Sequence, residues 1–222
     1  MRNILLLLCA ILMVSVSIVS AGIIFVPEAA GVQQTTVADA TTVDFNALTP
    51  GALGVYVSPI GSYSPGAIEA PDAFGGAYQT RYISVGAQSS PTTSYTLTLP
   101  SLQSYFGLYW AAGDAQNRLT FYNGATAQAT FRVSDFSGSL SAAYFGNPNT
   151  GLDPSEPFVY LNFYGTDGTQ FDSIRFWNNS STSTGFETDN HTIASAVPEP
   201  STYGLLLAGL GVIGALARRR VR

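Results

Sequence analysis

The sequence predicts an all-β fold for the central part of this 222-residue chain, in the form of a single jelly-roll-like β-sandwich. Three observations lead to this prediction. Between residues 22 and 195, no long stretch repeats its apolar residues at the helical period. Short segments of alternating apolar and polar residues are instead separated by glycine and proline. Asn123-Gly124 and Asp167-Gly168, which are typical of tight turns, lie between such segments. About nine short strands of this kind favour a sandwich.

The first 21 residues have the layout of a secretory signal peptide. Arg2 precedes an uncharged apolar run over residues 4–26, which includes Cys9, the only cysteine. Val19-Ser20-Ala21 offers residues that signal peptidase accepts, so we expect cleavage after Ala21. Cleavage would leave no thiol for a disulfide or for catalysis. The run is also long enough to span a bilayer, so an uncleaved anchor is the alternative.

A flexible lead-in over residues 22–40 is expected to precede the sandwich domain, residues 41–195. Alternation in this domain is clearest where Tyr95, Leu97 and Leu99 face one way. Residues 58–77 carry several prolines and glycines and predict a long loop or an edge segment, and residues 147–157 predict another loop. We expect strands at residues 41–45, 55–57, 78–85, 94–99, 104–110, 118–122, 128–133, 158–164, 171–178 and 185–193.

Residues 196–222 form a tail of three parts in strict order. Pro198-Glu199-Pro200 comes first and is followed by the uncharged residues 201–217. Seventeen residues in a helix rise about 25 Å, which is the low end for a transmembrane helix. The chain ends in a stop-transfer cluster made of Arg218, Arg219, Arg220 and Arg222. These arginines should stay on the cytoplasmic side and leave the body of the protein outside.

The tail resembles the PEP-CTERM sorting signal in its motif, its apolar span and its basic end. The resemblance implies export in a Gram-negative bacterium that makes exopolysaccharide. An inner-membrane-anchored precursor would be cut near Pro198-Glu199-Pro200 by an exosortase, a membrane-embedded cysteine transpeptidase. The product would reach the cell surface or the extracellular matrix. The implied partners are therefore signal peptidase, an exosortase and, transiently, the inner membrane. A plain C-terminal anchor is the alternative.

The body also resembles exosortase-dependent surface proteins with a single β-sandwich. The resemblance covers roughly residues 75–194 and rests on strand motifs such as residues 105–110 and 158–163. It implies no enzymatic activity, so we expect a structural or exopolysaccharide-associated component. Lysine is absent, and four arginines against fourteen acids give residues 22–199 a net charge of −10. This charge argues against nucleic acid as a partner.

Two sets of residues in the body are candidates for binding. Trp110, Trp177 and Tyr109 could stack on the rings of an exopolysaccharide, because aromatic faces suit the apolar side of a sugar. Core packing is the alternative for these aromatic residues. His191, the only histidine, is expected to be an ordinary surface or edge-strand residue, since no Gly-x-Ser-x-Gly motif accompanies it.

Glu187 and Asp189 stand two apart in a predicted strand and should point to the same face. With Asn190 as a further oxygen donor, they are a candidate structural calcium site, and we expect no other cofactor. The same two acids could instead serve a hydrolase, or be ordinary solvated acids. The alternative functions are therefore a secreted glycan-active hydrolase and a calcium-stabilised carbohydrate-binding module.

Overall fold

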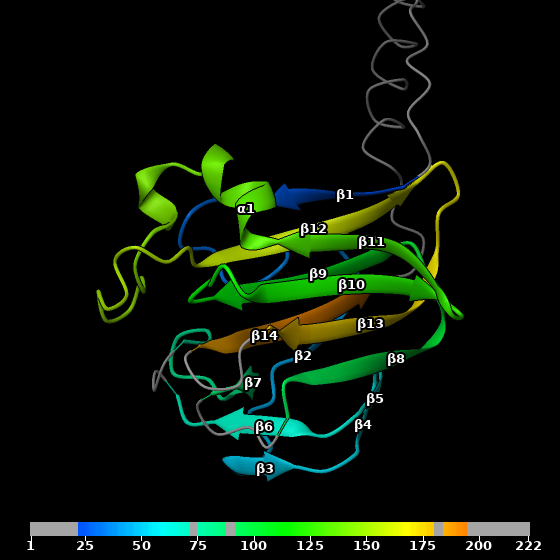
Figure 1. Ribbon diagram of the computed structural model, residues 1–222, viewed down its shortest axis with the longest axis horizontal. Coiled ribbons are helices and arrows are strands. Elements are labelled where there is room, and N and C mark those ends of the chain that lie inside the picture. The colour runs from blue at the N-terminus through cyan, green and yellow to red at the C-terminus, as the bar shows by residue number, and fades with distance from the viewer. Residues whose placement is uncertain (1–21, 72–74, 88–91, 180–183, 195–222) are drawn as a thin grey trace, which may run out of the picture.

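Each sheet of the protein has one apolar face, and the two sheets bury these faces against each other (Figure 1). The computed structural model describes residues 22–71, 75–87, 92–179 and 184–194. Most of the regular structure in these residues is antiparallel β-strand, with little helix. The predicted all-β class is therefore confirmed.

The strands form two sheets, here named sheet A and sheet B. Sheet A has the order β1 (Gly22–Pro27), β12 (Val159–Thr166), β9 (Tyr105–Ala111), β14 (Gly185–Ala194), β7 (Tyr82–Gly86), β6 (Gly66–Glu69) and β3 (Gly51–Leu53), and β2 (Ala40–Val43) also pairs with β14. Sheet B has the order β11 (Thr126–Arg132), β10 (Asn117–Asn123), β13 (Phe171–Asn178), β8 (Ser94–Gln103), β5 (Gly61–Tyr63) and β4 (Tyr56–Ser58). The short helices α1 (Val133–Phe136), η1 (Ser137–Ser139) and η2 (Ala142–Tyr144) follow β11.

Aromatic rings from both sheets meet in the core. Tyr95 and Phe176 stack within sheet B with ring centroids 4.4 Å apart. Phe106 of sheet A meets Phe121 of sheet B edge to face at 6.2 Å. Each such pair contributes about 0.5–1.5 kcal/mol beyond the area that it buries. The alternation of Tyr95, Leu97 and Leu99 is confirmed, because all three side chains are buried in this core.

The predicted flexible lead-in over residues 22–40 is wrong in its first part. Residues Gly22–Pro27 form β1, which pairs antiparallel with β12. Ile23 joins the buried core, and Phe25 packs against that core. The apolar run of the signal peptide continues without a break into this strand, so its hydrophobicity hid the alternation of β1.

For residues 58–77, the loop interpretation is partly wrong, because these residues include β5 and β6. Each of these strands is next to the last strand of its sheet, so the segment lies near the sheet edges. Strand β5 pairs with β8 through Ser62 and Tyr63. Gly61 makes this close approach feasible. Its φ is +142°, and a Cβ placed there would lie 2.2 Å from the carbonyl oxygen of Thr98. In the sequence, glycine at this position indicates a loop, yet in the structure it allows β5 to approach β8 closely.

The first and last described residues lie at the same end of sheet A. Gly22 pairs with Thr166 at the end of β12. Strand β14 is antiparallel to β9, and β9 is antiparallel to β12, so β14 also ends there, at Ala194. Among the described residues, no helix has the length and apolar character needed to cross a membrane. The predicted span at residues 201–217 lies outside them.

Candidate functional site

The sorting tail and the signal peptide lie outside the described residues. This applies to the motif Pro198-Glu199-Pro200 and to the stop-transfer residues Arg218, Arg219, Arg220 and Arg222. The other predicted site residues all fall in the sandwich, where their positions are defined.

Trp110 cannot stack on a glycan, because its side chain is 0 % exposed. It lies on the inner face of β9, with its ring 4.6 Å from that of Phe186 and 5.2 Å from that of Phe136. Its Nε1 donates a hydrogen bond to Asn117 Oδ1 at 3.3 Å. The prediction of Trp110 as a sugar-stacking residue is therefore wrong, and core packing was the right alternative.

Tyr109 lies on the opposite, outer face of sheet A, yet it is only 1 % exposed. Its hydroxyl accepts a hydrogen bond from Gln33 Nε2 at 3.4 Å. Burial raises the pKa of this hydroxyl above its ordinary value. The prediction of Tyr109 as a sugar-stacking residue is therefore also wrong for the folded protein.

Residues 28–39, here named the strap, cross the outer face of sheet A. Thr35 Oγ1 is 2.7 Å from the hydroxyl of Tyr105 and donates to Asn162 Oδ1 at 3.0 Å. Asn162 Nδ2 in turn donates to Glu28 Oε1 at 2.9 Å. These contacts cover a polar sheet surface that the alternation of β9 and β12 would otherwise leave exposed.

Asp189 lies on the same outer face, beside a β-bulge in β14. Asn190, the residue after it, has a φ of +50°, and the register against β9 shifts between residues 189 and 192. Asp189 Oδ2 accepts hydrogen bonds from the backbone N–H of Ala77 at 3.0 Å and from Thr80 Oγ1 at 2.6 Å. Burial raises the pKa of Asp189 to about 7, although its hydrogen bonds oppose that shift. Its carboxylate is thus already bound by the protein.

Glu187 shares this face, as predicted, since it follows the core residue Phe186 by one position. It is 1 % exposed, and its Oε1 has no hydrogen-bond partner among the described residues. Burial raises the pKa of Glu187 well above 4.5, and the nearby Asp114 and Glu156 raise it further. The neutral acid is therefore favoured over the carboxylate at this position.

In the candidate calcium site at Glu187, Asp189 and Asn190, the carboxylate oxygens of Asp189 and the side-chain nitrogen of Asn190 already bond to other groups of the protein. Within the described part of the chain, no three or more histidine, cysteine or acidic residues are placed to hold a metal ion. Asp189 Oδ1 accepts the backbone N–H of Asn190 at 2.7 Å, in addition to the two bonds on Oδ2. Asn190 Nδ2 donates to the carbonyl of Gln33 at 2.8 Å. These groups are used to hold the strap and the bulge together.

His191 lies in the core and not at the surface or a sheet edge as expected. Its Nδ1 is 3.0 Å from the hydroxyl of Tyr63, and its Nε2 is 2.9 Å from Thr188 Oγ1. Burial lowers its pKa to about 3, so the ring stays neutral. The ring stacks on Phe176 with centroids 4.9 Å apart. It is a packed, hydrogen-bonded core residue.

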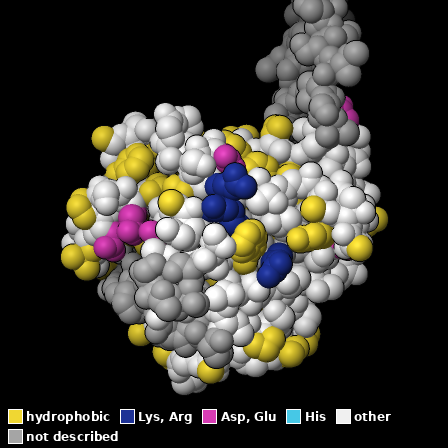
Figure 2. Space-filling view, viewed as in Figure 1, with side chains coloured by type: hydrophobic (Ala, Val, Ile, Leu, Met, Phe, Trp, Pro, Cys, Tyr) yellow, Lys and Arg dark blue, Asp and Glu magenta, His cyan; other side chains and the backbone are white. Residues whose placement is uncertain are grey.

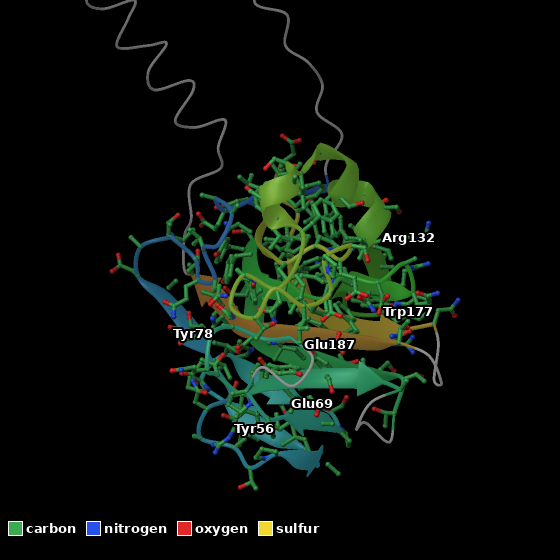
Figure 3. The ribbon with its side chains drawn as sticks, turned by 90° about the vertical axis from the view of Figure 1, so that its left-hand side faces the viewer. Tyr56, Glu69, Tyr78, Arg132, Trp177 and Glu187 are labelled. Carbon is green, nitrogen blue, oxygen red and sulfur yellow. The ribbon has the colours of Figure 1, made fainter. Side chains whose placement is uncertain are left out.

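Trp177 is the one predicted stacking residue that the fold leaves at the surface. It follows the core residue Phe176 in β13 and therefore points to the outer face of sheet B. Its side chain is partly exposed. Figure 3 shows it on the side of the sandwich opposite Tyr78. Other outward positions of sheet B carry hydroxyl groups that are at least partly exposed, namely those of Ser94, Thr96, Thr98, Thr130 and Ser173, whereas that of Thr120 is buried.

Residues 196–220 match the family model of the PEP-CTERM protein-sorting motif. The resemblance seen in the tail is thereby confirmed. The motif implies an exported, membrane-transiting protein that is processed by an exosortase and reaches the cell surface. No curated protein and no solved structure is significantly similar to the chain.

Proposed function

We propose that the protein is a non-enzymatic component of the cell surface or extracellular matrix that associates with exopolysaccharide after exosortase processing. The observation that carries the proposal is the open outer face of sheet B. Trp177 lies there with Arg118 and Ser94 as its neighbours across the sheet. An aromatic ring beside hydrogen-bonding groups on a flat surface suits a sugar chain. A jelly-roll-like topology, which many lectin domains have, is part of the same proposal.

The two ends of the body lie together, which suits a precursor anchored in an inner membrane, and we propose that this is the inner membrane of a Gram-negative bacterium. Gly22 and Ala194 lie at one end of sheet A, so both terminal segments of the precursor start from that end. The loop at residues 147–157 lies at the opposite end, beside Gly113 at the end of β9. In the inner-membrane-anchored precursor, the end with the loop at residues 147–157 would point away from the membrane. The outer faces of sheets A and B would then lie on the sides of the body.

A glycan-binding measurement tests the proposal. The mature protein, purified from the envelope of cells that express the full chain, should bind a subset of an array of bacterial exopolysaccharides. Trp177→Ala should weaken that binding by about tenfold, since loss of a contacting aromatic side chain typically costs more than 1 kcal/mol. Tyr78→Ala removes an aromatic ring that is 56 % exposed elsewhere, and it should leave binding unchanged. The proposal fails if the parent binds no glycan, or if Trp177→Ala binds as the parent does.

A glycan-active hydrolase is the second candidate, and Glu187 is the observation that favours it. A buried carboxyl with a raised pKa and an unpartnered oxygen has the character of a general acid. A glycosidase also needs a second carboxylate, and Asp189 on the same face is tied by three protein hydrogen bonds. If the parent protein releases reducing sugar from a glycan and the Glu187→Gln variant does not, a hydrolase becomes the better supported function.

A calcium-stabilised carbohydrate-binding module is the remaining alternative, and the protein hydrogen bonds already made by Asp189 and Asn190 weigh against it. Glycan binding that is lost with a chelator and restored by calcium would support this alternative. Binding that is unaffected by the chelator supports the metal-free proposal.

A further inference from the structure

Three of the four arginines between residues 22 and 199 share the outer face of sheet B. Arg118 is in β10, Arg132 in β11 and Arg175 in β13, which are adjacent strands. Each arginine is next to a core residue in its strand, and the alternation of a strand therefore turns it outward. Figure 2 shows basic side chains near one another on this face, with one acidic patch beside them and the main group of acidic side chains in that view apart, to the left.

The arrangement of these arginines is electrostatically unfavourable in the protein alone. Arg118 and Arg132 are direct partners across β10 and β11. Like charges at such positions destabilise a sheet. Burial lowers the pKa of Arg118, the charge of Arg132 lowers it further, and the nearby Asp135 carboxylate partly offsets these two effects. A protein with a large excess of acids has thus gathered most of its body arginines where they repel one another.

Neutral oxygens, rather than carboxylates, receive the hydrogen bonds of these arginines. Arg118 Nη1 donates to the carbonyl oxygens of Ala115 at 2.6 Å and Asn117 at 2.8 Å. Arg175 Nη2 donates to Ser94 Oγ at 3.3 Å. No ion pair to any of the three arginines occurs within the described parts of the chain.

The acids nearest in sequence to this face are held by backbone groups. Asp135 Oδ2 accepts the backbone N–H of Arg132 at 2.8 Å, and Asp172 Oδ2 accepts that of Gly124 at 2.9 Å. Asp135 thereby caps the start of α1, and Asp172 stabilises the turn after β10. The guanidinium groups therefore keep donors that can bind an external anion.

The surroundings of the arginines favour a carbohydrate anion. The guanidinium carbon of Arg175 lies 5.6 Å from the centroid of the Trp177 ring, and Arg118 is the cross-strand partner of Trp177. Cationic groups are thus next to an aromatic ring suited to a sugar and next to rows of hydroxyl side chains. Arginine, unlike lysine, binds a planar carboxylate through two parallel hydrogen bonds. The chain contains no lysine at all.

The spread of the binding groups and the overall charge restrict the class of anion that this face can bind. The arginines and Trp177 lie on three neighbouring strands, which suits an extended polymer better than a small anion, which needs a pocket. Duplex nucleic acid carries one charge per roughly 1.7 Å, and such a dense polyanion is repelled by a body with a net charge of −10. A polysaccharide with about one carboxylate per sugar or per repeat is less strongly repelled.

We propose that the outer face of sheet B binds an acidic polysaccharide, with Arg118, Arg132 and Arg175 contacting its carboxylates and Trp177 stacking on a sugar ring. This inference rests on the proposed exopolysaccharide association and adds the chemical class of the ligand. It also assigns a binding role to these three arginines, which the net negative charge of the chain does not suggest.

The test measures binding of the mature protein to alginate and polygalacturonate, which carry carboxylates, and to dextran, which is neutral. Arg132→Gln combined with Arg175→Gln should weaken binding to the two acidic polymers by about tenfold, because two charged contacts with the polymer are lost. Arg81→Gln alters the fourth body arginine, whose Nη1 donates to the carbonyl of Asn46. It serves as the control and should change binding less than twofold. Thermal unfolding checks that all variants fold.

These measurements distinguish failure of this inference from failure of the proposed function. If the double variant binds the acidic polymers as tightly as Arg81→Gln does, or if dextran binds as well as alginate, the inference is wrong. The proposed function then still holds, provided that Trp177→Ala loses glycan binding. Binding of single-stranded DNA as tight as that of alginate at equal salt would show an unspecific polyanion surface and also overturn the inference. If no polysaccharide binds, both proposals fail.

Discussion

Replacement of Glu187 by glutamine should weaken the pH dependence of the protein's stability between about pH 5 and pH 7. Burial raises the pKa of Glu187 well above 4.5, so the folded protein binds a proton that the unfolded chain releases. The free energy of unfolding therefore falls by about 1.4 kcal/mol per pH unit as the pH rises from 4.5 towards the pKa in the folded state. Glutamine has nearly the same shape and cannot ionise, so this contribution disappears.

Urea unfolding of the parent and Glu187→Gln at several pH values measures the effect. Burial also raises the pKa values of Asp189 and Glu156, each to about 7, so the variant keeps part of the slope. Glu187→Gln should be the more stable protein near neutral pH and lose that advantage near pH 4. Asp39→Asn removes an exposed acid and is the control. Equal slopes for Glu187→Gln and the parent would refute the assignment of a buried, proton-binding carboxyl.

Three further predictions concern the core and the two ends. Trp110→Ala should destabilise the protein by about 3–5 kcal/mol in urea unfolding, because it empties a fully buried site; a loss under 1 kcal/mol would contradict that placement. Alanine at all of Pro198-Glu199-Pro200 should leave an uncut, membrane-bound precursor on immunoblots of cell fractions, whereas normal surface release would indicate a plain anchor. N-terminal sequencing of the mature protein should start near Gly22, and a start at Met1 would show that the signal peptide is retained.

The alternation of single strands was the most dependable structural signal in the sequence. Val159, Leu161 and Phe163 stand two apart in the sequence, and their side chains all face the core. Ile174 and Phe176 have the same spacing and are also in the core. Each of these predictions needs only the local pleat, because neighbouring side chains of any strand point to opposite faces.

The same alternation was ambiguous where both faces of a strand are covered. In β9, all residues from Tyr105 to Ala111 are buried. The inner face contacts sheet B, and the outer face is covered by the strap, residues 28–39. The strap has no periodic pattern, and its contacts come from single side chains such as Gln33 and Thr35. Because the sequence does not reveal the strap, it predicted that Trp110 and Tyr109 were both available to bind a ligand.

By itself, the sequence determined the features that depend on neighbouring residues. These are the sorting motif at residues 196–220, the class of fold and the inward faces of most strands. Only the tertiary structure decided which faces are open, since that depends on segments far apart in the chain. The gathering of Arg118, Arg132 and Arg175 is of this kind. Their outward direction follows from local alternation, but their proximity requires the strand order β11-β10-β13, which long-range hydrogen bonding and core packing select.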